Sequence, residues 1–151
     1  MSAALSFAVL NDWADRLLPI AEKAGQATLD VRKRGFDVLA KNDTTPVTEA
    51  DQIAEGIIVA VLERLAPTIP IVAEERYSAD GPPNFKGENF WLVDALDGTK
   101  EFIKGGDDYT VNIALIWNGG PVLGLVHAPA RSETYLGVVD PNGSQRRAEV
   151  W

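Results

Sequence analysis

The sequence predicts an α+β protein, a layered α/β sandwich in which two N-terminal helices pack on a mostly antiparallel sheet. Two observations lead to this fold class: helical periodicity up to Leu65, and short apolar runs separated by turn residues after it. The size agrees, because a chain of 151 residues can bury about 68–70% of its unfolded surface around a single core. We therefore expect residues 1–151 to form one domain.

The first helix is expected from Leu10 onward, because apolar residues recur there at intervals of three and four. Gly35, which follows three basic residues, is a suitable end for this helix. Residues 36–40 are predicted to form a short strand, and the K-N-D-T-T-P segment that follows is predicted to form a loop. The buried stripe of the helix should consist of Leu10, Trp13, Ala14, Leu17, Leu18, Ala21 and Ala24.

The second helix has a cleaner pattern and should end near Leu65. Thr48 is its predicted N-cap, and Asp51, three residues later, would complete an acidic variant of the capping box. A second helix with one apolar stripe is what a layered fold requires, since that stripe must face a sheet. The predicted stripe consists of Ala50, Ile53, Ala54, Ile57, Ile58, Val61, Leu62 and Leu65.

Strands are expected after Pro67, where the first two apolar runs lack alternation, as in strands covered on both faces. Between them, residues 76–89 form a long polar loop rich in Gly and Pro, and loops of this kind are often functional or mobile. Short turns separate the later runs and favour antiparallel hairpins, and R-R-A-E-V-W begins a further strand. The predicted strands are residues 68–73, 90–96, 109–117, 121–128 and 133–139.

The composition excludes several classes of function. The absence of cysteine rules out disulfides, thiolate metal sites and cysteine nucleophiles, and we expect the single histidine, His127, to be a strand residue with a satisfied ring. The net charge of −8 argues against a nucleic acid polymer as partner. The N-terminal A-A-L-S-F-A-V-L is too short to span a bilayer and has no basic residues before it, so we expect no membrane partner and a cytoplasmic location.

Carboxylates gather at the ends of the predicted elements. Asp51 begins a helix, Glu74 and Glu75 follow one strand, and Asp94 and Asp97 close another. If the sheet brings the strand ends together, these acids repel one another unless a cation compensates their charge. Oxygen ligands without histidine or cysteine select Mg²⁺, Mn²⁺ or Ca²⁺, so the sequence indicates a hard-cation site.

The segment around D-A-L-D-G-T-K adds an anion site to this picture. At a bend, Asp94, Asp97 and the carbonyl of Leu96 can point at one ion. Gly98 lets the backbone approach a ligand closely, and the N–H groups from Gly98 to Lys100 would form an anion seat if a helical turn begins there. Carboxylates and a metal beside such a seat indicate a phosphate ester as substrate.

Each of these acids also has a purely structural interpretation. Asp97 could simply cap a turn, and Asp51 could be only the acid of the capping box. Glu74 and Glu75 could be a solvated strand end. We favour a site because acids stand at three successive element ends.

Three motifs together resemble a known family. T-P-V-T-E-A-D-Q, I-V-A-E-E and W-L-V-D-A-L-D-G-T-K-E-F-I are similar, in order and spacing, to motifs of the inositol monophosphatase superfamily of Mg²⁺-dependent, lithium-sensitive phosphatases. D-G-T-K-E-F, with T-V-N-I-A-L-I after it, most resembles the CysQ branch, the 3′(2′),5′-bisphosphate nucleotidases. The resemblance implies hydrolysis of the 3′-phosphate of adenosine 3′,5′-bisphosphate with two or three Mg²⁺ ions, or Mn²⁺. The small partner would be a phosphorylated nucleotide or a sugar-alcohol phosphate.

The resemblance also assigns roles by position. It implies a metal site made of Glu74, Asp94, the carbonyl of Leu96 and Asp97. It implies phosphate binding by Asp97, Gly98 and Thr99. It implies catalytic roles for Asp51, Thr99 and Glu74, with Asp51 and the Thr99 hydroxyl orienting or deprotonating the attacking water.

Two departures from the family pattern leave alternatives open. Ala95 stands where the family usually has proline, which frees a backbone dihedral between the acids. Family members also continue for roughly another such domain, so we expect residues 1–151 to match the N-terminal, metal-binding half. The alternatives are inositol monophosphatase-type activity, an inactive half that only binds metal or pairs with a missing C-terminal domain, and a structural domain with solvated acids. Exposed edge strands would favour self-association.

Overall fold

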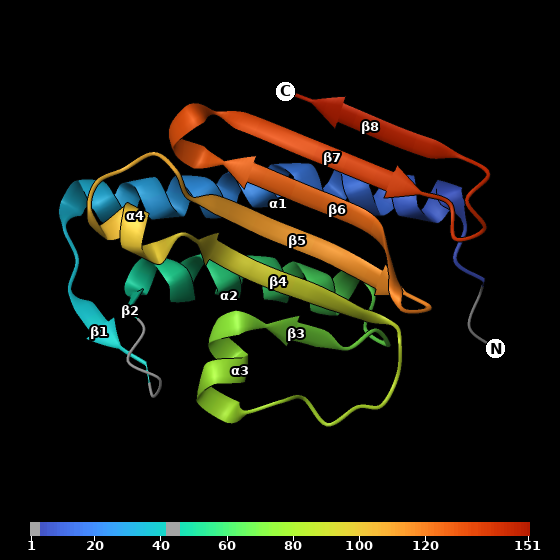
Figure 1. The fold of residues 1–151 in the computed structure, drawn as a ribbon, viewed down its shortest axis with the longest axis horizontal. Coiled ribbons are helices and arrows are strands. Elements are labelled where there is room, and N and C mark those ends of the chain that lie inside the picture. Colours follow the sequence, from blue (N-terminus) through green and yellow to red (C-terminus); the bar gives the residue numbers. More distant parts are fainter. Residues whose placement is uncertain (1–3, 42–45) are drawn as a thin grey trace.

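The computed structural model describes residues 4–41 and 46–151. Two long helices lie on one side of a six-stranded sheet, as the sequence predicts (Figure 1). The helices are α1 (Phe7–Arg34), α2 (Glu49–Leu65), α3 (Glu74–Asp80), α4 (Thr99–Ile103) and the 3-10 turn η1 (Pro129–Arg131). The strands are β1 (Val38–Ala40), β2 (Pro46–Thr48), β3 (Ile71–Ala73), β4 (Phe90–Asp97), β5 (Thr110–Trp117), β6 (Gly120–Ala128), β7 (Glu133–Val139) and β8 (Arg146–Val150).

The strands of the large sheet lie in the order in which they occur in the chain, from β3 to β8. Only its first pair, β3 and β4, is parallel, and α3 lies in the connection between these two strands. The four other pairs are antiparallel, which confirms the predicted hairpins. Because β3 and β4 are parallel, their carboxyl ends lie at the same edge of the sheet.

One face of the sheet packs on α1 and α2 and encloses the core. On β4 the side chains alternate, so Trp91 and Val93 point into this core and are at most 1% exposed. Trp91 contacts Trp13 of α1, with ring centroids 5.7 Å apart. Burial of each large apolar side chain contributes roughly 1.5–3 kcal/mol, so this interface holds the two layers together.

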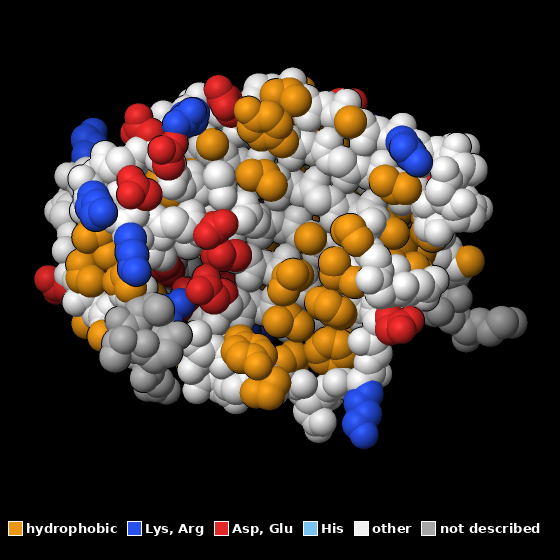
Figure 2. All heavy atoms as spheres, viewed as in Figure 1, with side chains coloured by type: hydrophobic (Ala, Val, Ile, Leu, Met, Phe, Trp, Pro, Cys, Tyr) orange, Lys and Arg blue, Asp and Glu red, His pale blue; other side chains and the backbone are white. Residues whose placement is uncertain are grey.

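The opposite face of the sheet is not covered by the described residues. Asp94, Asn112, Val126, Tyr135 and Val150 follow one another across adjacent strands as cross-strand partners. Several apolar side chains on this face are exposed, among them Tyr135 at 45%. Figure 2 shows hydrophobic side chains gathered on this face, with acidic side chains beside them. An apolar sheet face of this kind usually packs against something.

The structure corrects the predicted boundaries at several places. The first helix begins at Phe7, where Ser6 accepts a hydrogen bond from a backbone N–H group, and not at Leu10. Residues 74–80, mostly placed in a polar loop by the sequence, form α3; this helix buries none of its residues, so it carries no apolar stripe. Pro46, the last residue of the predicted K-N-D-T-T-P loop, begins β2, which pairs with β1. Residues 42–45 of that loop lie outside the described residues.

Two further predictions were wrong in detail. The strand predicted over residues 68–73 is confined to β3, Ile71–Ala73. On α2, Ile53 was placed in the buried stripe but is 39% exposed, whereas Glu55 is 5% exposed. A charged residue in a buried position needs hydrogen-bonding partners, and Glu55 has them. No described helix combines the length and the hydropathy needed to cross a bilayer.

His127 is a strand residue with a satisfied ring, as predicted. It is 7% exposed, and its Nδ1 lies 2.8 Å from the Thr134 hydroxyl. Burial lowers the pKa of His127, so the ring is neutral near pH 7. The ring lies against Gly25 of α1, where an added Cβ would be 2.6 Å from the imidazole. Gly25 therefore lets α1 and β6 approach each other.

We predict opposite effects of the same substitution at two helical glycines. Gly25→Ala should lower the free energy of unfolding by about 1–3 kcal/mol, because its Cβ overlaps His127 and Pro129. Gly56→Ala is the matched control, since nothing lies within 4 Å of its Cβ position, and it should stabilise α2 by roughly 0.5–1 kcal/mol. Urea unfolding of both variants measures this, and equal effects would contradict the close packing at Gly25.

Candidate active site

A bulge in β4 places two aspartates on the same face of the sheet. Asp94 pairs with Asn112 and Asp97 with Thr110, so three steps along β4 oppose two steps along β5. In a regular strand, residues three apart face opposite sides. Here the extra residue leaves Ala95 and Leu96 both buried and returns Asp97 to the side of Asp94. The bend that the sequence predicted between these acids is therefore this bulge.

Gly98 connects β4 to α4. Helix α4 is the helical turn on which the predicted anion-binding site depends. Gly98 has φ 96° and ψ 38°, a left-handed conformation that favours glycine. A Cβ here would lie 2.8 Å from the carbonyl oxygen of Asp108. The backbone N–H groups at the start of α4 have no acceptor within their own helix and can bind an anion.

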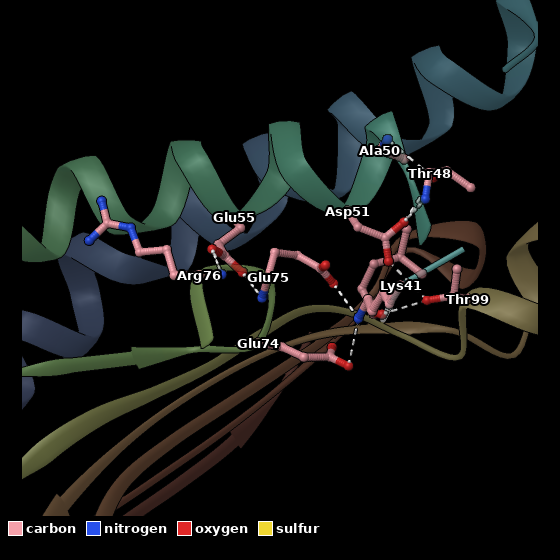
Figure 3. A network of polar contacts seen from close by, with 10 residues as sticks. Lys41, Thr48, Ala50, Asp51, Glu55, Glu74, Glu75, Arg76 and Thr99 are labelled. Carbon is pink, nitrogen blue, oxygen red and sulfur yellow. Dashed lines mark hydrogen bonds and ion pairs between the residues drawn. The ribbon is translucent and has the colours of Figure 1, made fainter. Parts of the chain in front are cut away.

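Asp51 joins the start of α2 to the start of α4 (Figure 3). Its Oδ2 accepts hydrogen bonds from the backbone N–H of Thr48, at 2.9 Å, and from the Thr48 hydroxyl, at 2.8 Å. Its Oδ1 accepts a hydrogen bond from the Thr99 hydroxyl, at 2.9 Å. Asp51 is 1% exposed. The helix cap and the contact with Thr99 can therefore exist together, because they use different oxygens of Asp51.

Glu74 and Asp94 form a close pair of acids at the shared edge of β3 and β4. Burial, a hydrogen bond with Glu74 and the negative charges of Glu74 and Asp97 raise the pKa of Asp94 to about 8. Among the residues that the structure describes, the buried Oδ1 of Asp94 has no hydrogen-bond partner. Two acids held this close need a proton or a cation between them.

Lys41 supplies positive charge from outside the predicted motifs. Its ammonium group lies 3.1 Å from Glu74 and 2.9 Å from Glu75, and its side chain is 9% exposed (Figure 3). Burial alone would lower the pKa of Lys41, but the hydrogen bonds to Glu75 and Glu74 raise it above its ordinary value. The sequence offered no signal for this contact, which joins residues more than 30 positions apart.

A cleft of about 280 Å³ lies over these residues. Its walls come from α3, from the start of α4 and from the segment around β1 and β2. The lining residues are Lys41, Pro46, Glu74, Ser78, Gly98, Thr99 and Lys100.

The donor set suits a hard divalent cation, although its side chains are not gathered around one point. Glu74, Asp94 and Asp97 offer oxygen atoms only, and the unpartnered Oδ1 of Asp94 is a free acceptor. Within residues 4–41 and 46–151, no three His, Cys, Asp or Glu side chains are arranged to hold a metal ion as they stand. Glu74 instead contacts Lys41, and Asp97 accepts a hydrogen bond from Asn112 at 3.2 Å.

The predicted site residues fall into two groups. Asp51, Thr99 and Gly98 lie together at the junction of α2 and α4. Glu74 and Asp94 lie together at the sheet edge, with Asp97 close enough for its charge to affect Asp94. The carbonyl of Leu96 lies 3.3 Å from the Thr99 hydroxyl and so connects the two groups.

Sequence reasoning passed over Glu55. Both of its carboxylate oxygens accept backbone N–H groups, from Glu75 at 2.7 Å and from Arg76 at 3.0 Å. Burial raises the pKa of Glu55, and these two hydrogen bonds oppose that rise. The sequence did contain one signal for Glu55, which is its position. It follows Asp51 by one helical turn and lies between the apolar residues Ala54 and Ile58.

Comparison with known proteins identifies the class. The model of the inositol monophosphatase family matches residues 10–147, and the chain belongs to this family. The chain is 42% identical over 127 residues to the 3′(2′),5′-bisphosphate nucleotidase CysQ of Escherichia coli K12, covering 80% of this chain and 50% of that protein. It is 43% identical to the CysQ of Shigella flexneri, with the same coverage.

Solved structures show the same fold. The Thermotoga maritima IMPase matches with a TM-score of 0.75 and 30% identity, over 91% of this chain and 51% of that one. The CysQ of Bacteroides thetaiotaomicron matches with a TM-score of 0.66 and 33% identity, over 91% of this chain and 49% of that one. The chain thus spans about half the length of these relatives.

We predict that Asp94→Asn changes how stability depends on pH in chelating buffer. The pKa of Asp94 is 3.8 in the unfolded chain and about 8 in the fold. The folded protein therefore binds the extra proton, and stability falls as pH rises through this window. In Asp94→Asn this fall should be smaller, so that the variant unfolds at higher urea than the wild type at pH 9. Parallel stability profiles for the two proteins would contradict the acid pair.

Proposed function

We propose that this chain supplies the metal- and phosphate-binding half of a Mg²⁺-dependent 3′(2′),5′-bisphosphate nucleotidase, which removes the 3′-phosphate of adenosine 3′,5′-bisphosphate. The observation that carries the proposal is the 2.9 Å hydrogen bond from Thr99 to Asp51 at the wall of the cleft that also contains Glu74. The 42–43% identity to proteins named CysQ supports the choice of a nucleotide substrate.

In this proposal the metal ligands are Glu74, Asp94, Asp97 and the carbonyl of Leu96. Mg²⁺ is the cofactor, as two or three ions, and Mn²⁺ can replace it; the oxygen-only donor set supports both. When bound, such ions lower the pKa of a water ligand and neutralise charge on the leaving oxygen. Lys41 competes with an ion for Glu74, because its ammonium group already holds that carboxylate at 3.1 Å.

The hydrogen bond between Thr99 and Asp51 fixes the direction of the Thr99 hydroxyl. Its proton points to Asp51 Oδ1, so the remaining lone pairs of the oxygen are acceptors for a water in the cleft. A water that donates a hydrogen bond to this oxygen keeps its own lone pairs available for attack on a phosphate bound near the first turn of α4. Asp51 can take up the proton that the hydroxyl passes on, and it therefore acts as the base of the pair.

The phosphate seat consists of backbone N–H groups at Gly98 and Thr99, with Asp97 beside them. The backbone N–H groups themselves carry no net charge, and the Lys100 side chain that lines the cleft adds positive charge beside them. A cation beside the phosphate site favours a substrate with more than one phosphate group, because Lys100 can contact a phosphate other than the one that is removed. This is the feature of the cleft that agrees with a bisphosphate.

A complete catalytic unit is proposed to include a second half of similar size. The chain spans about half of its relatives, and one sheet face with exposed Leu92 and Tyr135 has no cover among the described residues. Covering this face would also exclude water from Asp94. A chain that acts alone would instead be a metal-binding half, which could associate with a second copy through the same face.

A second candidate activity is hydrolysis of a sugar-alcohol phosphate such as inositol 1-phosphate. The TM-score of 0.75 with the Thermotoga maritima IMPase favours it. For either substrate we propose a cytoplasmic reaction.

The substrate assignment is tested by phosphate release. We expect adenosine 3′,5′-bisphosphate to be hydrolysed with kcat/KM at least about tenfold above that of inositol 1-phosphate. Activity should disappear in EDTA and return with Mg²⁺ or Mn²⁺. Each assay is run on the chain alone and on the chain mixed with the separately produced C-terminal half of Escherichia coli CysQ. Faster release from inositol 1-phosphate would reject the nucleotide, and activity only in the mixture would show that the second half is essential.

The role of Thr99 is tested by a pair of variants. Thr99→Val keeps the shape of the side chain but removes the hydroxyl, so kcat should fall by about 100-fold. Thr99→Ser keeps the hydroxyl and should retain most of the activity. If both variants lose activity equally, packing of the Thr99 methyl group matters more than its hydrogen bond to Asp51.

A further inference from the structure

Helix α2 carries two buried carboxylates on the same face, one turn apart. Asp51 is 1% exposed and Glu55 is 5% exposed. Asp51 accepts a hydrogen bond from Thr99, which follows the end of β4. Glu55 accepts hydrogen bonds from Glu75 and Arg76, which follow the end of β3. The two acids thus connect one helix to both strand ends that build the candidate site (Figure 3).

Glu55 supplies a cap that α3 lacks in its own sequence. The residue at the N-cap of α3 is Ala73, which has no polar side chain, so the first N–H groups of the helix need an external acceptor. The Oε2 of Glu55 lies 2.7 Å from the Glu75 nitrogen, and its Oε1 lies 3.0 Å from the Arg76 nitrogen. The carboxylate therefore binds two consecutive peptide groups at once.

These two hydrogen bonds set the direction of Glu74. The peptide bond between Glu74 and Glu75 is planar, so an anchored Glu75 N–H fixes the orientation of that plane and with it the ψ angle of Glu74. The N–H of Arg76 fixes the next plane in the same way. Glu74 itself follows β3 directly, where Ala73 pairs with Val93. The backbone of Glu74 is thus held from both sides.

We propose that Glu55 is a positioning residue for the metal site, because it holds the backbone of Glu74 in the orientation that places its side chain in the wall of the cleft. The proposal rests on the proposed function, in which Glu74 and Asp94 bind the cation. Partners of this kind, which orient a ligand without touching the ion, typically change metal affinity or activity by 10- to 100-fold when they are removed. Glu55 does this through the main chain.

Glu55→Gln is the informative substitution. Glutamine has nearly the same shape but one acceptor oxygen, and its NH₂ group would face one of the two N–H groups. One anchor is lost while the side chain stays. We expect the affinity for Mn²⁺ and Mg²⁺, measured by calorimetric titration of the chelator-stripped protein, to fall by at least about tenfold. In phosphate-release assays, the Mg²⁺ concentration for half-maximal rate should rise, while kcat at saturating Mg²⁺ changes little.

Glu63→Gln is the matched control. Glu63 lies on the same helix and contacts the same Arg76, but through the guanidinium group, at 3.1 Å, and on the surface. This variant removes the same charge from α2 and should leave metal affinity unchanged. A double variant with Glu74→Gln tests the route of the effect. If Glu55 acts through Glu74, adding Glu55→Gln to Glu74→Gln should cause little further loss of affinity.

The outcomes separate the two proposals. If the wild type takes up neither Mn²⁺ nor Mg²⁺, the proposed metal site is wrong, and the role of Glu55 falls with it. If the wild type binds metal and Glu55→Gln binds it equally well, only the positioning role is wrong. Should Glu55→Gln not fold, hydrogen exchange of the wild type decides: protected Glu75 and Arg76 amides support the anchor, and amides that exchange as fast as exposed ones overturn it.

Discussion

The candidate site depends on the buried face of α2 where two carboxylates replace apolar side chains. A buried carboxylate is stable only when hydrogen bonds replace the water it has lost. Asp51 obtains these bonds from Thr48 and Thr99, and Glu55 obtains them from the backbone after β3. Both carboxylates need hydrogen-bond donors, and they find them in the segments that follow β3 and β4. These two segments are therefore held side by side on one helix. The chemistry of the cleft follows from this constraint.

The same cleft concentrates charge of both signs. Burial and the nearby Glu74 raise the pKa of Asp94 to about 8, while Lys41 contacts both Glu74 and Glu75. A protein of net charge −8 can hold such a group of acids only with positive charge nearby. The ammonium group of Lys41 supplies part of it, and a divalent ion would supply more.

The sequence predicted what depends on local pattern. The two long helices, the antiparallel hairpins and the capping box at Thr48 follow from periodicity and turn residues, and the structure confirms them. The contacts of Lys41 and Glu55 could not be predicted, because they join segments about 20 to 34 positions apart. Helix α3 was missed for a related reason: it buries none of its residues, so it has no stripe, and Glu55 on another helix caps it. The roles of the metal and phosphate residues stay predictions.

Because of the bulge in β4, the positions of the two aspartates depend on the number of residues between them. Each residue in a strand reverses the side to which the following side chains point. Without the bulge, regular pairing of these four residues with β5 would turn Asp97 into the hydrophobic interior, and a deletion that removes the bulge would also take away one of the two buried residues between the acids. Chain-length changes should therefore be tolerated in the exposed connection before β4, where no strand register is at stake, and rejected within these four positions.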